Sequence, residues 1–336
     1  MASSPDVIVI GAGVLGLCTA AELGARGHAV TVVDPGGPNA SAVAAGMLAP
    51  ALESLLEDLP PERAALLKRA RDLWPAVAET NGLKLHRDGA DWRGADAAMA
   101  LSRLQALGFE ARQSDGGLTT SDDWRIDVGP ALTALARAPG VAVVRGRVAR
   151  LTDEGRRWRV EAADGRVWFS PTVVLATGAD PAIAGLPDPV AAVVNAVQPV
   201  RGQLTAVATA APPRVIRAPN VYVAPGEGGV VIGATMEPGR RDLAPDAAES
   251  ARQVGAGLAL LGAAGEAGAV RVGIRGATPD GLPLAGPARE PGLHLALAPR
   301  RNGWLMGPLV AQVVADGIEG RAPLADAAAL DPLRFA

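Results

Sequence analysis

Residues 6–34, DVIVIGAGVLGLCTAAELGARGHAVTVVD, decide the fold. Residues 6–10 are a short β-branched run typical of a buried parallel strand. The glycine-rich segment GAGVLG follows at residues 11–16, and apolar residues at helical spacing then continue to Gly27. A second strand is expected at 29–34. The order strand, glycine turn, helix and strand predicts a βαβ unit that binds a dinucleotide.

Each residue of the turn has a separate physical task. Gly11 permits the tight turn, Gly13 lets a pyrophosphate approach the backbone, and Gly16 allows the helix to pack closely on the strand. The free N–H groups at the helix start attract phosphate. Asp34, at the end of the second strand, is placed to bind a ribose diol. A glycine-rich turn without a ligand is the alternative.

The composition excludes several other classes of protein. The 336-residue chain has a net charge of −3, with scattered basic residues, which argues against a nucleic-acid partner. No apolar run is long enough for a membrane span, and the N-terminus does not resemble a signal peptide, so we expect a cytoplasmic protein. A single cysteine, Cys18, and three widely spaced histidines offer no metal site.

The segment AGMLAP, Ala45 to Pro50, resembles neither a regular strand nor a regular helix. A buried loop of small residues would explain it. The chain as a whole, however, resembles the D-amino-acid-oxidase-like flavoproteins, and within them the glycine oxidase group. Five segments carry the resemblance: residues 6–34, ASAVAAGMLAP (40–50), PVRGQL (199–204), residues 220–242, and residues 272–308 with VGIRGATPDGLPLAGP and RNGWLMGP.

The resemblance implies an α/β fold with a discontinuous Rossmann-like FAD-binding domain and an antiparallel-sheet substrate domain, of the D-amino-acid-oxidase/glutathione-reductase type. We expect residues 1–80, 126–194 and 271–336 to form the first domain and residues 81–125 and 195–270 to form the second.

The resemblance also implies FAD, bound without a covalent link because Cys18 lies far from the position used by covalent relatives. AGMLAP would then pass beside the flavin ring, and Ser41 would lie near the phosphates or the ribityl chain. The implied cofactor contacts are Gly11, Gly13, Val14, Leu15, Gly16, Asp34, Ser41, Ala45, Gly46, Met47, Val148, Thr177, Gly178, Arg275, Arg301, Asn302, Gly303, Trp304 and Leu305.

Three residues are candidates for the substrate site. Arg275 matches the carboxylate-binding arginine of the family, and a guanidinium can clamp a carboxylate with two parallel hydrogen bonds. Tyr222, the only tyrosine, would supplement it, since alternation places Tyr222 and Ala224 on one strand face. Arg301 matches an arginine near substrate and flavin. Asn302 and Gly303 would begin the final helix, whose positive end would point at the flavin, and a simple helix capped by Asn302 is the alternative. A surface arginine and a core tyrosine are the alternatives.

The implied reaction is hydride transfer from the substrate Cα to flavin N5. The imine would hydrolyse to a 2-oxo acid and ammonia, and dioxygen would become hydrogen peroxide. In the family, glycine oxidases serve thiamine biosynthesis. Arg300 replaces an aromatic residue usual before RNG, which suggests a larger or more acidic amine than glycine. A dehydrogenase, a specialised-metabolite amine oxidase or a non-catalytic flavin-binding protein remain alternatives, and a homo-oligomer is left open.

Overall fold

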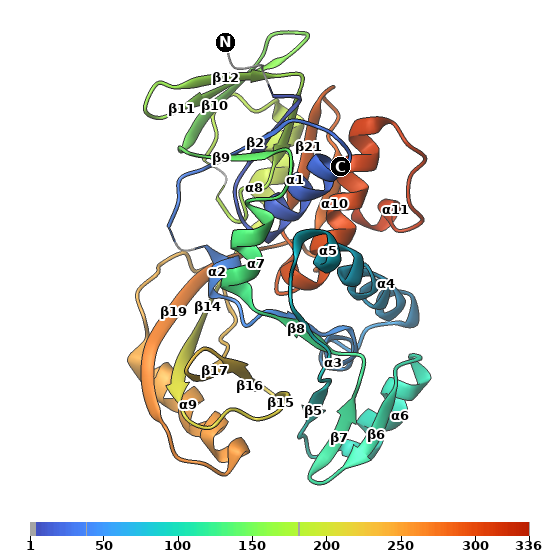
Figure 1. The fold of residues 1–336 in the computed structure, drawn as a ribbon, viewed down its shortest axis with the longest axis vertical. Coiled ribbons are helices and arrows are strands. Elements are labelled where there is room, and N and C mark those ends of the chain that lie inside the picture. Colours follow the sequence, from blue (N-terminus) through green and yellow to red (C-terminus); the bar gives the residue numbers. More distant parts are fainter. Residues whose placement is uncertain (1–4, 38, 181, 336) are drawn as a thin grey trace.

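The computed structural model describes residues 5–37, 39–180 and 182–335. Its upper part in Figure 1 is built on a six-stranded sheet. The two central strands are β13 (Thr172–Leu175) and β1 (Val7–Ile10). Four neighbouring pairs are parallel, and only β20 runs antiparallel to β21. The strand order is β20 (Leu284–Pro287), β21 (Leu293–Leu297), β13 (Thr172–Leu175), β1 (Val7–Ile10), β2 (Val30–Asp34) and β9 (Val141–Arg145).

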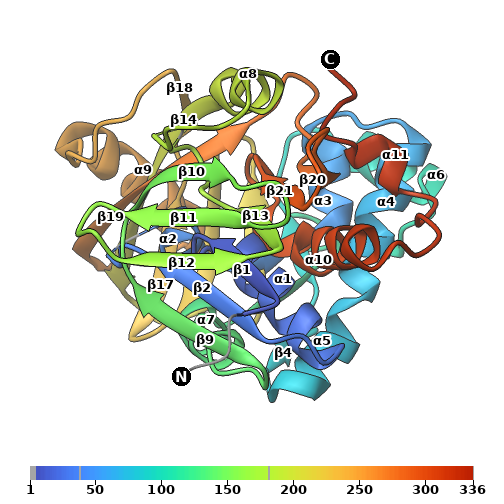
Figure 2. The same ribbon diagram turned by 90° about the horizontal axis from the view of Figure 1, so that it is seen from above.

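Both faces of this sheet are covered, as a parallel sheet requires. Helices α1 (Val14–Ala25) and α10 (Gly303–Glu319) pack on one face with buried apolar side chains. A three-stranded sheet and α8 (Asp188–Ala196) cover the other face, and Figure 2 shows the small sheet lying over the main one. The small sheet consists of β10 (Val148–Asp153), β11 (Trp158–Ala162) and β12 (Val167–Ser170).

The turn between β1 and α1 requires its glycines. Gly11 has φ of +112°, and a Cβ there would lie 2.3 Å from the Ala176 carbonyl oxygen. A Cβ on Gly16 would lie 2.0 Å from the Gly11 carbonyl oxygen. Only glycine at positions 11 and 16 therefore allows helix α1 to lie this close to the turn.

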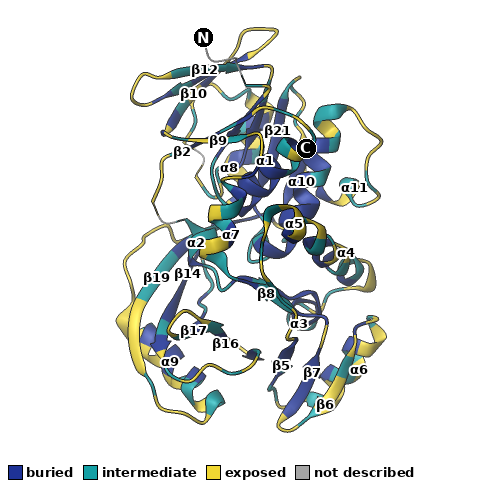
Figure 3. Ribbon diagram, in the orientation of Figure 1, coloured by how far each residue is buried: buried dark blue, intermediate teal, exposed yellow. Residues whose placement is uncertain are grey.

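The lower part of the molecule is a nine-stranded, mainly antiparallel sheet. The strand order is β18 (Glu237–Pro238), β14 (Gln198–Ala208), β17 (Gly229–Gly233), β16 (Val221–Gly226), β15 (Val215–Ala218), β5 (Ala90–Trp92), β7 (Gly117–Thr120) and β6 (Ala111–Ser114), and β19 (Glu266–Ala277) also pairs with β14. Helix α9 (Ala247–Leu261) packs on this sheet. In Figure 3 the outer part of β19 is exposed, whereas the strands toward the centre are buried.

Short elements join the two sheets. The chain passes from α2 (Ala40–Val43) through β3 (Met47–Leu48) into α3, and β3 forms a small sheet with β8 (Trp124–Ile126) and β4 (Leu85–His86). The remaining helices are α3 (Pro50–Leu56), α4 (Pro61–Asp72), α5 (Trp74–Asn81), α6 (Ala97–Ala106), α7 (Val128–Leu135) and α11 (Ala327–Leu330).

Two sequence-based expectations need revision. The sequence of residues 61–79 predicts one helix, but the structure has two, α4 and α5, because Pro75 lacks an N–H group and its ring would collide with the carbonyl four residues earlier. The domain boundary expected at residue 271 falls inside β19, which pairs with β14 along its length, so residues 271–277 belong to the substrate sheet. In the part of the chain described, no helix combines the length and apolarity needed to cross a membrane.

Candidate functional site

A cavity of about 400 Å³ lies beyond the carboxyl ends of β1 and β2. Gly11, Asp34, Val148 and Thr177 all line it. Asp34 Oδ2 accepts a hydrogen bond of 2.7 Å from Ala12 N, and Oδ1 accepts one of 2.7 Å from Gly36 N. Each carboxylate oxygen keeps a further lone pair that can accept a ribose hydroxyl. The carboxyl ends of parallel strands are where such sheets bind nucleotides.

The start of α1 faces the same cavity. Ser41 Oγ accepts a 2.9 Å hydrogen bond from Val14 N, and a Cβ on Gly13 would lie 3.3 Å from that oxygen. The Ser41 hydroxyl proton therefore stays available to a phosphate, while the helix start contributes its partial positive charge. The space beside Gly13 and Ser41, with its backbone N–H groups, fits the pyrophosphate of a dinucleotide. The residues present therefore fit FAD.

Two further cavities continue from this one toward the second sheet. A narrow one of about 90 Å³ shares Gly13, Ser41 and Gly178 with the first, and opens beside a large one of about 820 Å³. Ala45, Gly46 and Met47 line the large cavity. Gly46 has φ of +72°, and a Cβ there would lie 2.1 Å from the Ile126 carbonyl oxygen, so the AGMLAP backbone itself forms the wall.

Helix α10 begins where the narrow and large cavities meet. Asn302 is its N-cap residue, but the Asn302 side chain makes no capping hydrogen bond. The first helical bond runs from Met306 N to Asn302 O at 2.8 Å, so the N–H groups of residues 303–305 have no intrahelical acceptor. Trp304 Nε1 donates to Ser41 O at 3.1 Å, which ties this helix start to the cofactor loop.

Most of the sequence-predicted cofactor residues come together along this groove. Two do not line any of the three cavities: Gly16 contacts the Gly11 backbone, and the Leu305 side chain lies in the apolar core. A cofactor contact of Leu305 therefore stays a prediction, made through its backbone N–H in the first turn of α10. The residues that line the three cavities are Gly11, Gly13, Val14, Leu15, Asp34, Ser41, Ala45, Gly46, Met47, Val148, Thr177, Gly178, Arg275, Arg301, Asn302, Gly303 and Trp304.

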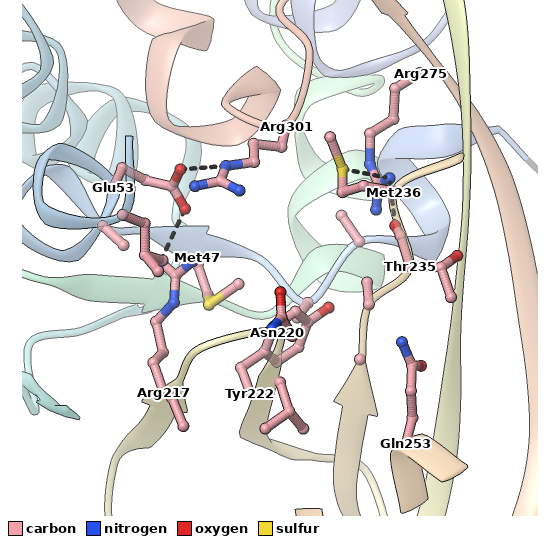
Figure 4. A pocket seen from close by; sticks show the side chains of 18 of the residues that line it. Met47, Glu53, Arg217, Asn220, Tyr222, Thr235, Met236, Gln253, Arg275 and Arg301 are labelled. Atoms are coloured by element: carbon pink, nitrogen blue, oxygen red, sulfur yellow. Dashed lines mark hydrogen bonds and ion pairs between the residues drawn. The ribbon is translucent and has the colours of Figure 1, made fainter. Parts of the chain in front are cut away.

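Arg275, in β19, presents its guanidinium to both the large and the narrow cavity. Its Nη1 donates to Thr235 O at 3.2 Å and to Met236 Sδ at 3.4 Å, and both acceptors are uncharged (Figure 4). Burial lowers the pKa of Arg275, with Arg301 adding to the effect. Within the described part of the chain, this guanidinium has no carboxylate at ion-pair distance, so it is suited to an incoming one.

Tyr222, in β16, lines the large cavity. It shares an apolar cluster with Ala224, while Val221 and Val223 lie in another, as strand alternation predicts. Burial raises the pKa of Tyr222, although Arg275 opposes this effect. The phenol is therefore neutral and can donate a hydrogen bond. A Cβ on Gly233 would lie 3.1 Å from the hydroxyl, so this glycine makes room for it.

Arg301 does not face the cavity as a free cation. Its Nε donates to Glu53 Oε2, and Arg217 Nη1 donates to Glu53 Oε1 at 2.8 Å (Figure 4). Burial by itself would raise the pKa of Glu53, but the two arginines hold it below its ordinary value. Glu53 and Arg217 were missed from the sequence, because only the fold brings the α3 carboxylate beside the β15 guanidinium.

A second carboxylate completes this cluster. Glu57 pairs with Arg300 and lies 3.0 Å from Arg301 Nη2. Arg300 is thus already paired, which argues against its expected role in binding a second acidic group of the substrate. Three of the four arginines on this side of the cavity, Arg217, Arg300 and Arg301, pair with Glu53 and Glu57, and Arg275 pairs with neither carboxylate. Four guanidinium groups and two carboxylates leave a formal excess of two positive charges.

Asp123 fixes the position of the helix that carries Glu53. Its carboxylate accepts 2.8 Å and 3.1 Å hydrogen bonds from Ala51 N and Leu52 N at the start of α3. Burial raises the pKa of Asp123 to about 7, although Arg217 opposes the effect. The helix start is thereby held by a residue that lies 72 positions further along the chain than Ala51, and Glu53 is held with it.

Comparison with known proteins shows the family to which the chain is related. A family model described as FAD dependent oxidoreductase (DAO) matches residues 6–317. The glycine oxidase of Pseudomonas aeruginosa is 30% identical, with 98% of this chain and 99% of that protein covered. The glycine oxidase of Geobacillus kaustophilus is also 30% identical, with 94% and 93% covered.

Some other similar proteins are longer than this chain or are named for a reaction other than glycine oxidation. The tRNA 5-methylaminomethyl-2-thiouridine biosynthesis bifunctional protein MnmC of Ralstonia nicotianae is 32% identical over 98% of this chain, which spans 60% of that protein. Among solved structures, glycine oxidase from G. kaustophilus has a TM-score of 0.80 at 24% identity, covering 98% and 99% of the two chains. Iminodiacetate oxidase from Chelativorans sp. BNC1 has a TM-score of 0.82 at 22% identity, covering 97% and 98%.

Proposed function

Because the chain belongs to the DAO family of FAD-dependent oxidoreductases, we propose that it is an oxidase of a small amino acid or secondary amine that carries a carboxylate. When bound, FAD would supply the two-electron redox chemistry, with the substrate Cα–H as the hydride donor and dioxygen, which becomes hydrogen peroxide, as the final acceptor. The substrate imine then hydrolyses to a 2-oxo acid and ammonia or a primary amine.

The observation that carries the proposal is the uncompensated guanidinium of Arg275. It lies on the large cavity, between the AGMLAP wall and the second sheet. A substrate carboxylate would replace its two weak, uncharged acceptors with two charge-assisted hydrogen bonds. The neutral Tyr222 hydroxyl on the same wall would donate to the substrate and orient it.

The excess positive charge of the arginine cluster would favour binding and reduction of the flavin ring. Of the two positive charges left over in the arginine cluster, one would be matched by the substrate carboxylate. The other, with the free N–H groups of residues 303–305, would stabilise negative charge that reduction places on the ring. Arg301 would act in this electrostatic way, since Glu53 and Glu57 hold it. No histidine or carboxylate base is needed if the amine arrives neutral.

Anaerobic mixing with amines tests this function. We expect glycine, sarcosine or another carboxylate-bearing amine to bleach the flavin absorbance, and Arg275→Leu to weaken this at least about 100-fold while the protein stays yellow. Arg112→Leu, on an exposed strand outside the three cavities, is the matched control. Peroxide formation under air separates an oxidase from a dehydrogenase. If no amine bleaches the flavin, the function is wrong and a non-catalytic flavin protein becomes the better description.

A further inference from the structure

The large cavity continues beyond the arginine cluster to a second end, which we call the distal end. Four residues of α9 and its N-cap form it: Asp246, Glu249, Arg252 and Gln253. In Figure 4, Gln253 lies on the Thr235 side of the cavity, and Glu53 lies on the opposite side. The cavity measures about 820 Å³, which is in the range of sites for drug-sized ligands. Glycine, with only two carbons, would not reach from Arg275 to α9.

The distal end contains a buried polar group with unused hydrogen-bonding capacity. Gln253 is only 2% exposed, and among the described residues its Oε1 has no hydrogen-bond partner. Its amide points from α9 toward the space beneath Thr235 and Arg275 (Figure 4). A buried amide without a partner is costly, and native structures keep few of them. Because the two ends of a glutamine amide can exchange, Gln253 can offer the cavity an acceptor or a donor.

The charges around Gln253 restrict what can bind there. Asp246 and Glu249 line the cavity, and Arg252 is paired with Glu249. Among the described residues, the Asp246 carboxylate accepts a hydrogen bond only from the backbone N–H of Glu249. The distal end is therefore slightly negative, whereas the arginine cluster at the other end is positive. A second carboxylate on the substrate would be repelled here, but a neutral hydroxyl or amide would not.

We propose that Gln253 is a specificity-determining residue that hydrogen-bonds a neutral hydroxyl or amide group on the substrate's extension. This inference rests on the proposed oxidase function. The substrate's carboxylate binds Arg275, its Cα faces the flavin, and the extension runs past Tyr222 to α9. The substrate class is an amino acid or N-substituted glycine longer than glycine with an uncharged polar end.

Two N-substituted glycines that differ in one group test this assignment. Neither compound has a stereocentre at the Cα, so the comparison does not depend on which enantiomer the enzyme prefers. N-(2-hydroxyethyl)glycine and N-propylglycine differ only by a hydroxyl in place of a terminal methyl. We expect the holoenzyme to prefer the hydroxyl compound by about 10- to 100-fold in the ratio of anaerobic reduction rate to dissociation constant. Gln253→Leu should remove or reverse that preference, and Gln253→Asn should restore part of it if the shorter amide still reaches.

The matched control is Gln105→Leu, the same substitution at an exposed glutamine of α6 outside the three cavities. It should leave the preference unchanged. Because the readout is a ratio between two ligands, general damage from Gln253→Leu does not imitate the expected result. Binding is also measured with the corresponding ether acids, which lack the amine, through the shift of the flavin spectrum.

Two results would overturn the assignment while leaving the oxidase function intact. One is equal use of the two compounds by the unmodified enzyme. The other is a preference for N-(2-carboxyethyl)glycine over the hydroxyl compound, which would mean that the distal end selects an acid. Failure of every amine to bleach the flavin would instead remove the oxidase function, and the assignment of Gln253 with it.

Discussion

The guanidinium of Arg275 lies directly over Gly202 of the neighbouring strand. A Cβ on Gly202 would come within 2.1 Å of Arg275 Nη1 and 2.5 Å of Nη2. The bare glycine thus sets the position of the proposed carboxylate clamp, although Gly202 does not itself line the cavity. A residue in β14 therefore controls a side chain in β19 across the strand pair.

Gly202→Ala should weaken substrate binding without removing the cofactor. The new methyl group must push the guanidinium away from its place, and misplaced charge-assisted hydrogen bonds are weak. We expect the dissociation constant of the amine to rise at least about 10-fold, measured by saturation of anaerobic flavin reduction. Gly226→Ala is the control, because its Cβ would meet Val231 at an ordinary 3.4 Å. Unchanged amine affinity in Gly202→Ala would mean that the clamp lies elsewhere.

Glu53→Gln should destabilise the protein strongly. The change leaves Arg217 and Arg301 without their shared carboxylate in a buried site. Removing one partner of a buried ion cluster costs about 3–5 kcal/mol of unfolding free energy. Urea unfolding measures the loss, and the double variant Glu53→Gln/Arg217→Met should recover part of it because one uncompensated cation is gone. Equal stability of the single variant and the unmodified protein contradicts the geometry described for this cluster.

Gly11→Ala should prevent FAD binding. Its Cβ would strike the Ala176 carbonyl, and its φ of +112° is strained for any L-residue. Overpacking and backbone strain together should cost about 3 kcal/mol or more, and the ratio of flavin to protein absorbance should fall. Gly27→Ala is the control: its φ is +94°, but a Cβ there would meet no atom within 4 Å. It should cost only about 1–2 kcal/mol and keep its flavin.

His294 should make stability depend on pH between about 4 and 6.5. Burial lowers the pKa of His294 to about 4 from 6.5, although backbone groups of Gly317 and Gly292 oppose the effect. In this range the unfolded chain binds a proton that the folded protein cannot, so stability falls as pH decreases from about 6.5 to 4. The loss amounts to at most about 3 kcal/mol. Unfolding in urea at several pH values should show a flatter profile for His294→Gln, and parallel profiles would contradict this assignment.

The sequence by itself determined the nucleotide-binding half of the protein. Gly11, Gly13, Gly16 and Asp34 act through backbone geometry within one βαβ unit, and such local requirements are written in consecutive residues. The face on which Tyr222 lies also followed from strand alternation alone. Glycine spacing and strand alternation were sufficient to predict these features, although the turn at Gly11 also packs against Ala176 from a distant part of the chain.

Only the tertiary structure decided the state of the charges at the substrate end. Glu53 meets Arg217 and Arg301 across more than 160 residues of sequence, and no periodic pattern records such a meeting. The fold pairs Arg301 with Glu53, leaves Arg275 without a carboxylate partner among the described residues, and buries the Gln253 amide at the far end of the same cavity. Charge compensation depends on distances between strands and helices from different parts of the chain, and only folding sets those distances.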